Sequence, residues 1–87
     1  MSGSRLLIDI EVLEFLRTLR RHEQEYLLKR FREIATSPAQ FSDFVERDSA
    51  GRRVDDHVSG KYAIKFWDEF ADRQLKILDV HPADLSA

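Results

Sequence analysis

Three consecutive β-strands in the second half of the chain constrain its fold more than any other feature. The residue pattern predicts them at Arg52–Ser59, Lys61–Trp67 and Arg73–Val80. In the middle strand, apolar residues alternate with a second set of side chains, which is the period of two that a half-buried strand shows. Polar connections separate the strands, and the first is a tight turn at Gly60, so the three form an antiparallel meander.

Two amphipathic helices are predicted before these strands. The first begins near Glu11. Its apolar residues recur at the spacing of one helix face, namely Val12, Phe15, Leu16 and Leu19. The second runs from about His22 to Ala35 and ends before Pro38, because the residue that precedes a proline is pushed out of the α region. A short turn joins the two into a helical hairpin, which must bury its apolar stripe on another layer.

The natural packing is an α+β domain in which the two-helix hairpin covers one face of a three- to four-stranded antiparallel sheet. The fourth strand would be an edge strand at Asp43–Glu46. The apolar run Arg5–Ile10 is either a further strand or the lead-in to the first helix, since periodicity cannot separate the two at this length. The 87 residues leave room for one small domain. We expect it to span residues 5–87, with residues 1–4 as a disordered terminus or a remnant of cloning.

Composition narrows the class of protein. The chain has no cysteine, which excludes disulfides, thiolate catalysis and cysteine zinc sites. Fourteen Lys and Arg against sixteen Asp and Glu give a net charge of −2, a poor global match for a nucleic-acid binder. No apolar run approaches the roughly 20 residues of a membrane span, and the first residues do not read as a secretory signal. Metal-ligand spacings and phosphate-binding loops are also missing. We therefore expect a cytoplasmic protein with no membrane partner, no metal and no small-molecule cofactor.

The order of these elements resembles that of a known family. The matching segments are the two helices at Leu13–Leu19 and Tyr26–Ala35, the break at Ser37-Pro38, the glycine-led strand Gly60–Trp67 and the last strand at Leu75–His81. Together they resemble the RelE/ParE toxin superfamily of bacterial toxin–antitoxin modules. The resemblance covers about residues 11–81, and the order and spacing of the elements carry it.

This resemblance implies a mode of action. RelE-type toxins cut mRNA on the ribosome with basic and aromatic residues on the concave sheet face, and they use no metal. ParE-type toxins keep the same shape but block gyrase. Both types are neutralised by an antitoxin segment that wraps over the fold. The implied partners are therefore an antitoxin protein and either the ribosome with its mRNA or gyrase.

The usual catalytic residues of the family are largely missing from this chain. RelE-type toxins place an arginine shortly before the glycine-led strand, where this sequence has Asp56-His57-Val58. A second arginine follows the tyrosine of that strand in the family, and Ala63 occupies its place here. The last strand often ends on a charge-stabilising arginine, whereas this one ends at His81-Pro82-Ala83. These departures make mRNA cleavage the less favoured function.

The candidate site residues are basic, imidazole or aromatic side chains on the strands and at their ends. Histidine can act as a general acid or base near neutral pH, which brings two histidines forward. The tentative catalytic residues are His81, His57, Arg73 and Lys65. On the face opposite the apolar alternation, Trp67 and Lys65 form an aromatic–basic pair that can stack a base or receive a partner's apolar side chain. The binding candidates are Trp67, Arg52, Arg53, Lys61 and Lys76.

Ordinary structural roles compete with these assignments. A strand-terminal His81 can simply bond to Asp79, two residues earlier on the same face. The polarity of an exposed edge strand explains His57 equally well. Trp67 fits an ordinary core position, and basic residues beside hairpins are usually solvated.

Three functions follow from the sequence. The first is a toxin-type protein that acts by binding an antitoxin and a cellular target. The second is an active, metal-independent endoribonuclease that depends on the ribosome. The third is a toxin-derived interaction module without toxicity. The acidic net charge favours the first and third over the second.

Overall fold

The computed structural model describes residues 4–83. Its elements, in chain order, are β1 (Arg5–Ile8), α1 (Ile10–Arg17), α2 (Arg21–Thr36), the 3₁₀ helix η1 (Pro38–Phe41), β2 (Phe44–Arg47), β3 (Arg53–Ser59), β4 (Tyr62–Glu69) and β5 (Gln74–Pro82). Both helices, the meander and the edge strand lie within two residues of their predicted bounds. The disorder expected for residues 1–4 falls mostly outside the described residues. The one described residue among them, Ser4, donates its backbone N–H to the Ala35 carbonyl at 3.1 Å.

The sheet corrects the prediction of three to four antiparallel strands. It has five strands in the order β1-β5-β4-β3-β2. It is mixed, because β1 pairs with β5 in parallel while the other pairs are antiparallel. The undecided run at the start of the chain thus supplies a fifth strand. A parallel partner needs a long crossover, and here the helices and the meander lie between the two strands.

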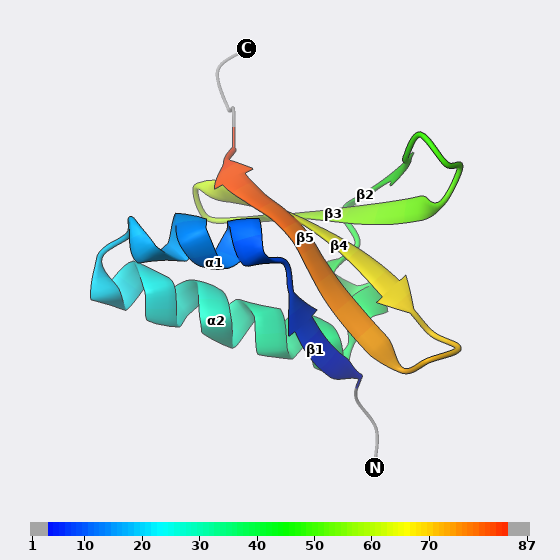
Figure 1. Ribbon diagram of the computed structural model, residues 1–87, viewed down its shortest axis with the longest axis horizontal. Helices are drawn as coiled ribbons and strands as arrows, with labels where there is room; N and C mark the ends of the chain where they lie inside the picture. The colour runs from blue at the N-terminus through cyan, green and yellow to red at the C-terminus, as the bar shows by residue number, and fades with distance from the viewer. Residues whose placement is uncertain (1–3, 84–87) are drawn as a thin grey trace.

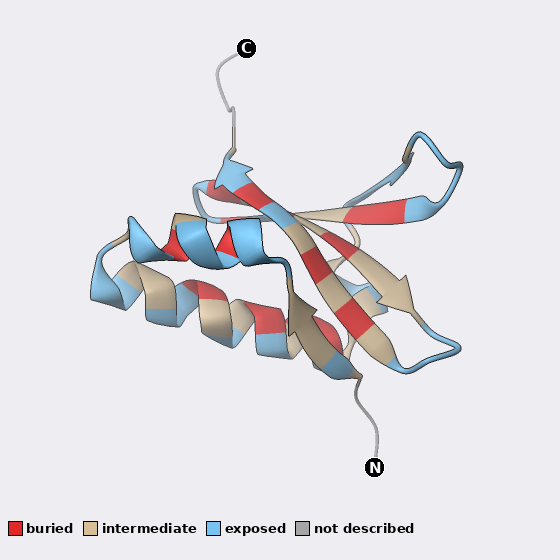
Figure 2. Ribbon diagram, viewed as in Figure 1, coloured by how far each residue is buried: buried red, intermediate tan, exposed pale blue. Residues whose placement is uncertain are grey.

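The helices cover one face of the sheet and leave the other open. Figure 1 shows α1 and α2 side by side, and Figure 2 shows the buried residues as stripes on the helices and on the central strands. The core combines both layers, with Phe31, Ile34, Phe66 and Ile77 fully buried. Leu6 and Ile8 of β1 pack against the same cluster. No helix within residues 4–83 is long and apolar enough to cross a membrane.

A β-bulge in the β4–β5 pair keeps the correct residues on each face. Lys65 pairs with Asp79 and Phe66 pairs with Ile77, so Leu78 has no opposite partner. The extra residue in β5 lets Ile77 and Val80, three apart, both face the helices. It explains why β5 is apolar at positions that a regular alternation would place on opposite faces.

The turn at the start of β4 fastens the meander to the helical layer. Ser59 and Tyr62 are paired, so Gly60 and Lys61 form a two-residue hairpin loop. Gly60 has φ 61°, a left-handed conformation that glycine adopts without steric cost. Next to this loop the Tyr62 hydroxyl donates to Glu23 of α2, and the Tyr26 hydroxyl bonds to the Ser59 hydroxyl. These contacts hold the hairpin end against α2.

Candidate functional site

The sheet face away from the helices carries a groove of about 450 Å³, here called the open-face groove. Its lining residues come from β2, β3, β4, the end of β5 and the residue after it: Phe44, Glu46, Asp56, Val58, Ala63, Lys65, His81 and Ala83. Side chains two apart on a strand share a face, which is why Ala63 and Lys65 line it together. The groove is apolar at Phe44 and Val58 and charged along Glu46 and Asp56.

Carboxylates accompany both basic candidates in this groove. Lys65 Nζ lies 3.2 Å from Glu46 Oε2, and His81 Nδ1 lies 2.7 Å from Asp79 Oδ2. Asp56 pairs with Lys65 across the β3–β4 ladder and shares a hydrogen bond with Glu46. Burial, followed by the Glu46 carboxyl, raises the pKa of Asp56 to about 6. The same hydrogen bond, helped by Lys65, lowers the pKa of Glu46. The groove therefore holds two neighbouring carboxyls, Asp56 and Glu46, beside a lysine and a histidine.

His57 lies on the other face of the sheet. It pairs with Ile64, which is fully buried under the helices. The side chain is only 12% exposed, with Nδ1 2.9 Å from Asp43 Oδ2. Its ring packs edge-on against the Phe41 ring of η1, with 5.1 Å between the ring centroids. Its Nε2 is buried without a hydrogen-bond partner among the described residues. The structure therefore does not bring His57 together with His81.

Arg73 is also distant from the open-face groove. It precedes β5, and His81 is near the far end of that strand, so the two are separated by roughly 25 Å. Arg73 has φ 53°, and its carbonyl accepts the Arg5 backbone N–H at 2.8 Å. Of the four tentative catalytic residues, Lys65 and His81 share a groove, whereas His57 and Arg73 lie elsewhere.

Trp67 lies between two cations on the open face. The Arg52 guanidinium carbon is 4.4 Å from the Trp67 ring centroid, and Lys76 Nζ is 5.0 Å from it. Lys76 pairs with Trp67 across the β4–β5 ladder, so this contact follows from the register. Three of the five binding candidates are thus in contact, and we call Arg52, Trp67 and Lys76 the Trp67 cluster.

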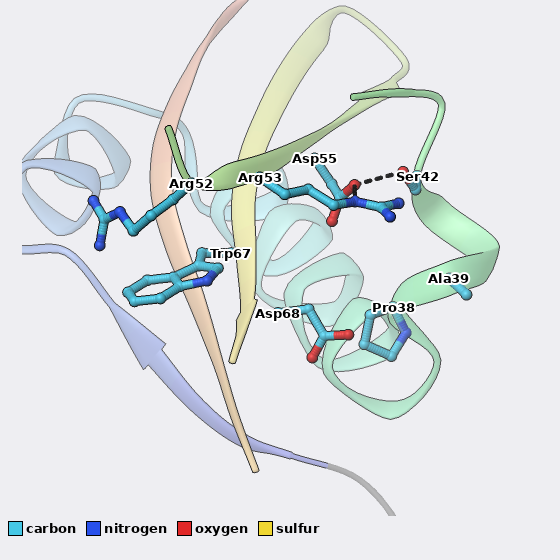
Figure 3. A pocket seen from close by; sticks show the side chains of 8 residues that line it. All are labelled: Pro38, Ala39, Ser42, Arg52, Arg53, Asp55, Trp67 and Asp68. Carbon is cyan, nitrogen blue, oxygen red and sulfur yellow. Dashed lines mark hydrogen bonds and ion pairs between the residues drawn. The ribbon is translucent and has the colours of Figure 1, made fainter. Parts of the chain in front are cut away.

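A second cavity, of about 460 Å³, begins at this cluster and runs toward η1 (Figure 3). In Figure 3 Arg52 lies over the Trp67 ring, while Arg53 points the other way, toward Ser42. Arg53 Nε is 3.1 Å from Asp55 Oδ1, and the Ser42 hydroxyl donates to that oxygen at 2.8 Å. Arg53 is therefore held by the Asp55 carboxylate. Burial and the same Asp55 carboxylate raise the pKa of Asp68, which lines the same cavity.

The last binding candidate, Lys61, lies at the hairpin loop near α2. Its Nζ is 3.3 Å from Glu23 Oε2, on the helical side of the molecule.

Sequence reasoning missed Phe44, Glu46 and Asp56 as site residues. Only the strand register could have found them, because Phe44 pairs with Asp56 and Asp56 with Lys65. Within residues 4–83, no three carboxylate or imidazole side chains gather in a way that could hold a metal ion.

Comparison with known proteins identifies the fold. No protein-family model matches the chain, and no curated protein sequence matches it. A chain of the toxin–antitoxin complex RelBE2 from Mycobacterium tuberculosis superposes with a TM-score of 0.79 at 15% identity, covering 95% of this chain and 94% of that one. A chain of the archaeal RelE–RelB complex from Pyrococcus horikoshii OT3 superposes with a TM-score of 0.80 at 17% identity, covering 97% and 99%. The chain therefore shares its fold with these chains of RelE–RelB-type complexes, as the sequence resemblance predicted.

Proposed function

We propose that this protein is the toxin-type component of a toxin–antitoxin module and acts by binding an antitoxin and a cellular target. The observation that carries the proposal is the fold, shared over nearly the whole length of the chain with members of two RelE–RelB-type complexes. In those complexes the matching protein is recorded together with its partner. An antitoxin is accordingly the first partner to expect.

The charges of the open face support binding of a protein over cleavage of RNA. Lys65 and His81, which would have to face phosphates, each have a carboxylate within 3.2 Å. Asp56 adds a further acidic group to the groove. Phosphate contacts supply most of the affinity of nucleic-acid binding, and a cation already paired with a carboxylate contributes less to them. The Trp67 cluster is the basic part of this face.

A second candidate is a metal-independent endoribonuclease, and one observation favours it. The open-face groove brings His81, oriented by Asp79, together with Lys65 and with Asp56, whose pKa is about 6. General acid–base catalysis works best when such groups titrate near the working pH. On this route His81 and Asp56 exchange protons with the ribose hydroxyl and the leaving oxygen, while Lys65 faces the phosphate.

Induced expression in a bacterium, with primer extension on abundant mRNAs, tests the proposal. Growth arrest without new mRNA ends, relieved when an antitoxin is co-expressed, is the expected result. Arrest with codon-positioned cuts that disappear in Lys65→Ala and His81→Ala, but persist in the exposed helical control Lys29→Ala, would favour the ribonuclease. Absence of arrest at verified expression would overturn the toxin function.

A further inference from the structure

Strand β2 is the most exposed regular element of the described chain. It forms one edge of the five-stranded sheet, and all four of its residues are exposed (Figure 2). Two of them are large and apolar, with Phe44 62% and Val45 52% exposed. The strand at the opposite edge, β1, is half-buried at three of its four positions. An exposed apolar edge strand is a template for pairing with another chain.

The backbone of β2 is oriented for such pairing. Asp48 donates its backbone N–H to the Arg52 carbonyl at 3.0 Å, which closes the β2–β3 hairpin. In an antiparallel ladder, alternate residues bond to the partner strand. Counting back from Asp48, the backbone groups of Glu46 face β3, and those of Val45 and Arg47 face outward. No strand within residues 4–83 covers these outward groups.

The side chains beside this edge specify what an added strand would carry. Phe44 and Glu46 are two residues apart and both line the open-face groove. On the next strand Asp56 lies opposite Phe44, and Val58, two residues further along β3, adds an apolar side chain to the same groove. Neighbouring strands place side chains of one face opposite one another. The matching segment therefore has an apolar residue and, two positions away, a basic one.

We propose that β2 is a docking edge for an extended segment of a partner polypeptide, which adds to the sheet as a strand and places an apolar side chain beside Phe44 and a basic side chain beside Glu46. Main-chain hydrogen bonds to Val45 and Arg47 supply affinity, and the groove supplies the choice of side chains. An RNA strand is disfavoured here, because its phosphates would lie against Glu46 and Asp56.

The identity of the natural partner rests on the proposed function, but the docking chemistry can be measured without it. Short random peptides displayed on phage are selected on the full chain, and selected sequences are synthesised with a fluorophore for binding measurements by anisotropy. We expect enrichment of an apolar residue two positions from Lys or Arg. Failure to enrich any peptide, or enrichment of acidic ones, would overturn the docking edge.

A matched pair of variants tests the backbone contact. Val45→Pro removes one outward N–H and leaves the β2–β3 ladder intact, because proline is tolerated on an edge strand where its nitrogen faces solvent. Losing one hydrogen bond and the close approach of the strand should weaken peptide binding roughly tenfold. Val45→Thr keeps the N–H and the side-chain shape, and its affinity should equal that of the unmodified chain. Equal affinity of Val45→Pro and Val45→Thr contradicts strand addition.

Two further measurements keep the test decisive if Val45→Pro does not fold. Phe44→Ser changes an exposed side chain and should weaken the same peptide, whereas Phe70→Ser, at the distant β4–β5 loop where Phe70 is 85% exposed, should not. Amide hydrogen exchange at Val45 and Arg47 should slow when the peptide binds.

Displacement of the peptide by a single-stranded RNA of mixed sequence, with protection at the Trp67 cluster instead, would overturn the proposal in favour of nucleic acid. Growth arrest combined with no peptide docking would remove this inference alone.

Discussion

The Lys65 ammonium reaches across strand β3 to lie 3.2 Å from the Glu46 carboxylate of β2. Asp56 belongs to the intervening strand and interacts with both groups, with Glu46 by a hydrogen bond and with Lys65 by opposite charge. Two carboxyls and one ammonium therefore form one cluster on the open face. Burial first, and then the neighbouring Glu46 carboxyl, make Asp56 the carboxyl of this cluster that is less well stabilised as an anion.

Replacing Asp56 should stabilise the protein in a pH-dependent way. The pKa of Asp56 is about 6 in the folded chain, above the value of about 3.9 for an unfolded aspartate. The folded state therefore binds more protons between these two values, and stability falls as pH rises through this window. Asp56→Asn removes that loss, so its free energy of unfolding should exceed the parent value at neutral pH. Near pH 4.5, where folded Asp56 is protonated, the advantage should be small.

Urea unfolding followed by Trp67 fluorescence measures this difference at both pH values. The control is Asp72→Asn in the exposed β4–β5 loop, which should behave like the parent at each pH. A stabilisation of Asp56→Asn that is the same at both pH values would mean that ionisation of Asp56 is not its cause.

The Trp67 cluster should contribute measurably to stability. Arg52 contacts both the Trp67 ring, at 4.4 Å, and Asp48 Oδ2, at 2.7 Å. A partly exposed cation–π contact is worth about 1 kcal/mol, and an exposed ion pair adds little to it. Arg52→Ala should lower the free energy of unfolding by that amount and shift the Trp67 emission spectrum. Arg52→Lys keeps the charge but loses the planar stacking. Its free energy of unfolding should lie between those of the parent and Arg52→Ala.

Arg73 is in a left-handed conformation that a side chain with a Cβ pays for. Its φ is 53°, and its backbone closes the β4–β5 loop by donating to the Phe70 carbonyl at 3.1 Å. Arg73→Gly relieves a strain of about 1 kcal/mol. Glycine also loses more conformational entropy on folding, which offsets most of this gain. The melting temperature should therefore be unchanged or slightly higher. Arg73→Val should be clearly less stable, because a β-branched residue tolerates this conformation poorly. A melting temperature of Arg73→Gly below that of Arg73→Val would show that the side chain matters more than the backbone.

The elements that sequence reasoning located are those with a local signal. Both helices and the three-stranded meander repeat their apolar residues with periods that stretches of this length can display. β1 has only four residues, and its pairing with β5 joins the two ends of the chain. Its parallel orientation depends on Leu6 and Ile8 reaching the core from the first strand, which no short-range pattern contains.

The candidate site was predictable only where alternation along one strand decides the face. Lys65 and Trp67 were expected on one face by this rule. Asp56 and His57 are neighbouring polar residues, and the sequence does not indicate which face each occupies. The pleat of β3 places Asp56 on the open face and His57 on the face toward the helices. Phe44 and Glu46 join the groove through the β2–β3 register, which the sequence of β2 does not encode by itself.

Tyr62→Phe should destabilise the protein, and the loss should shrink in acid. The Tyr62 ring is buried, and its hydroxyl donates to Glu23 of α2. That hydrogen bond, more than the neighbouring Lys61, lowers the pKa of Glu23, and it raises the pKa of Tyr62 to about 12. A hydrogen bond to a charged group is stronger than one between neutral groups, so Tyr62→Phe should lower the free energy of unfolding at neutral pH. Because the folded-state pKa of Glu23 is depressed, its contribution is present above the unfolded value and disappears as pH falls through the folded one.

The check is urea unfolding of Tyr62→Phe and Glu23→Gln across the acidic range. The two variants should lose similar stability at neutral pH, and the double variant should lose little more than either single change. The difference from the parent should narrow as pH falls through the lowered pKa of Glu23 and the carboxyl becomes protonated. Additive losses, or a difference that stays constant with pH, would show that the Tyr62 hydroxyl does not stabilise the hairpin through its bond to the Glu23 carboxylate.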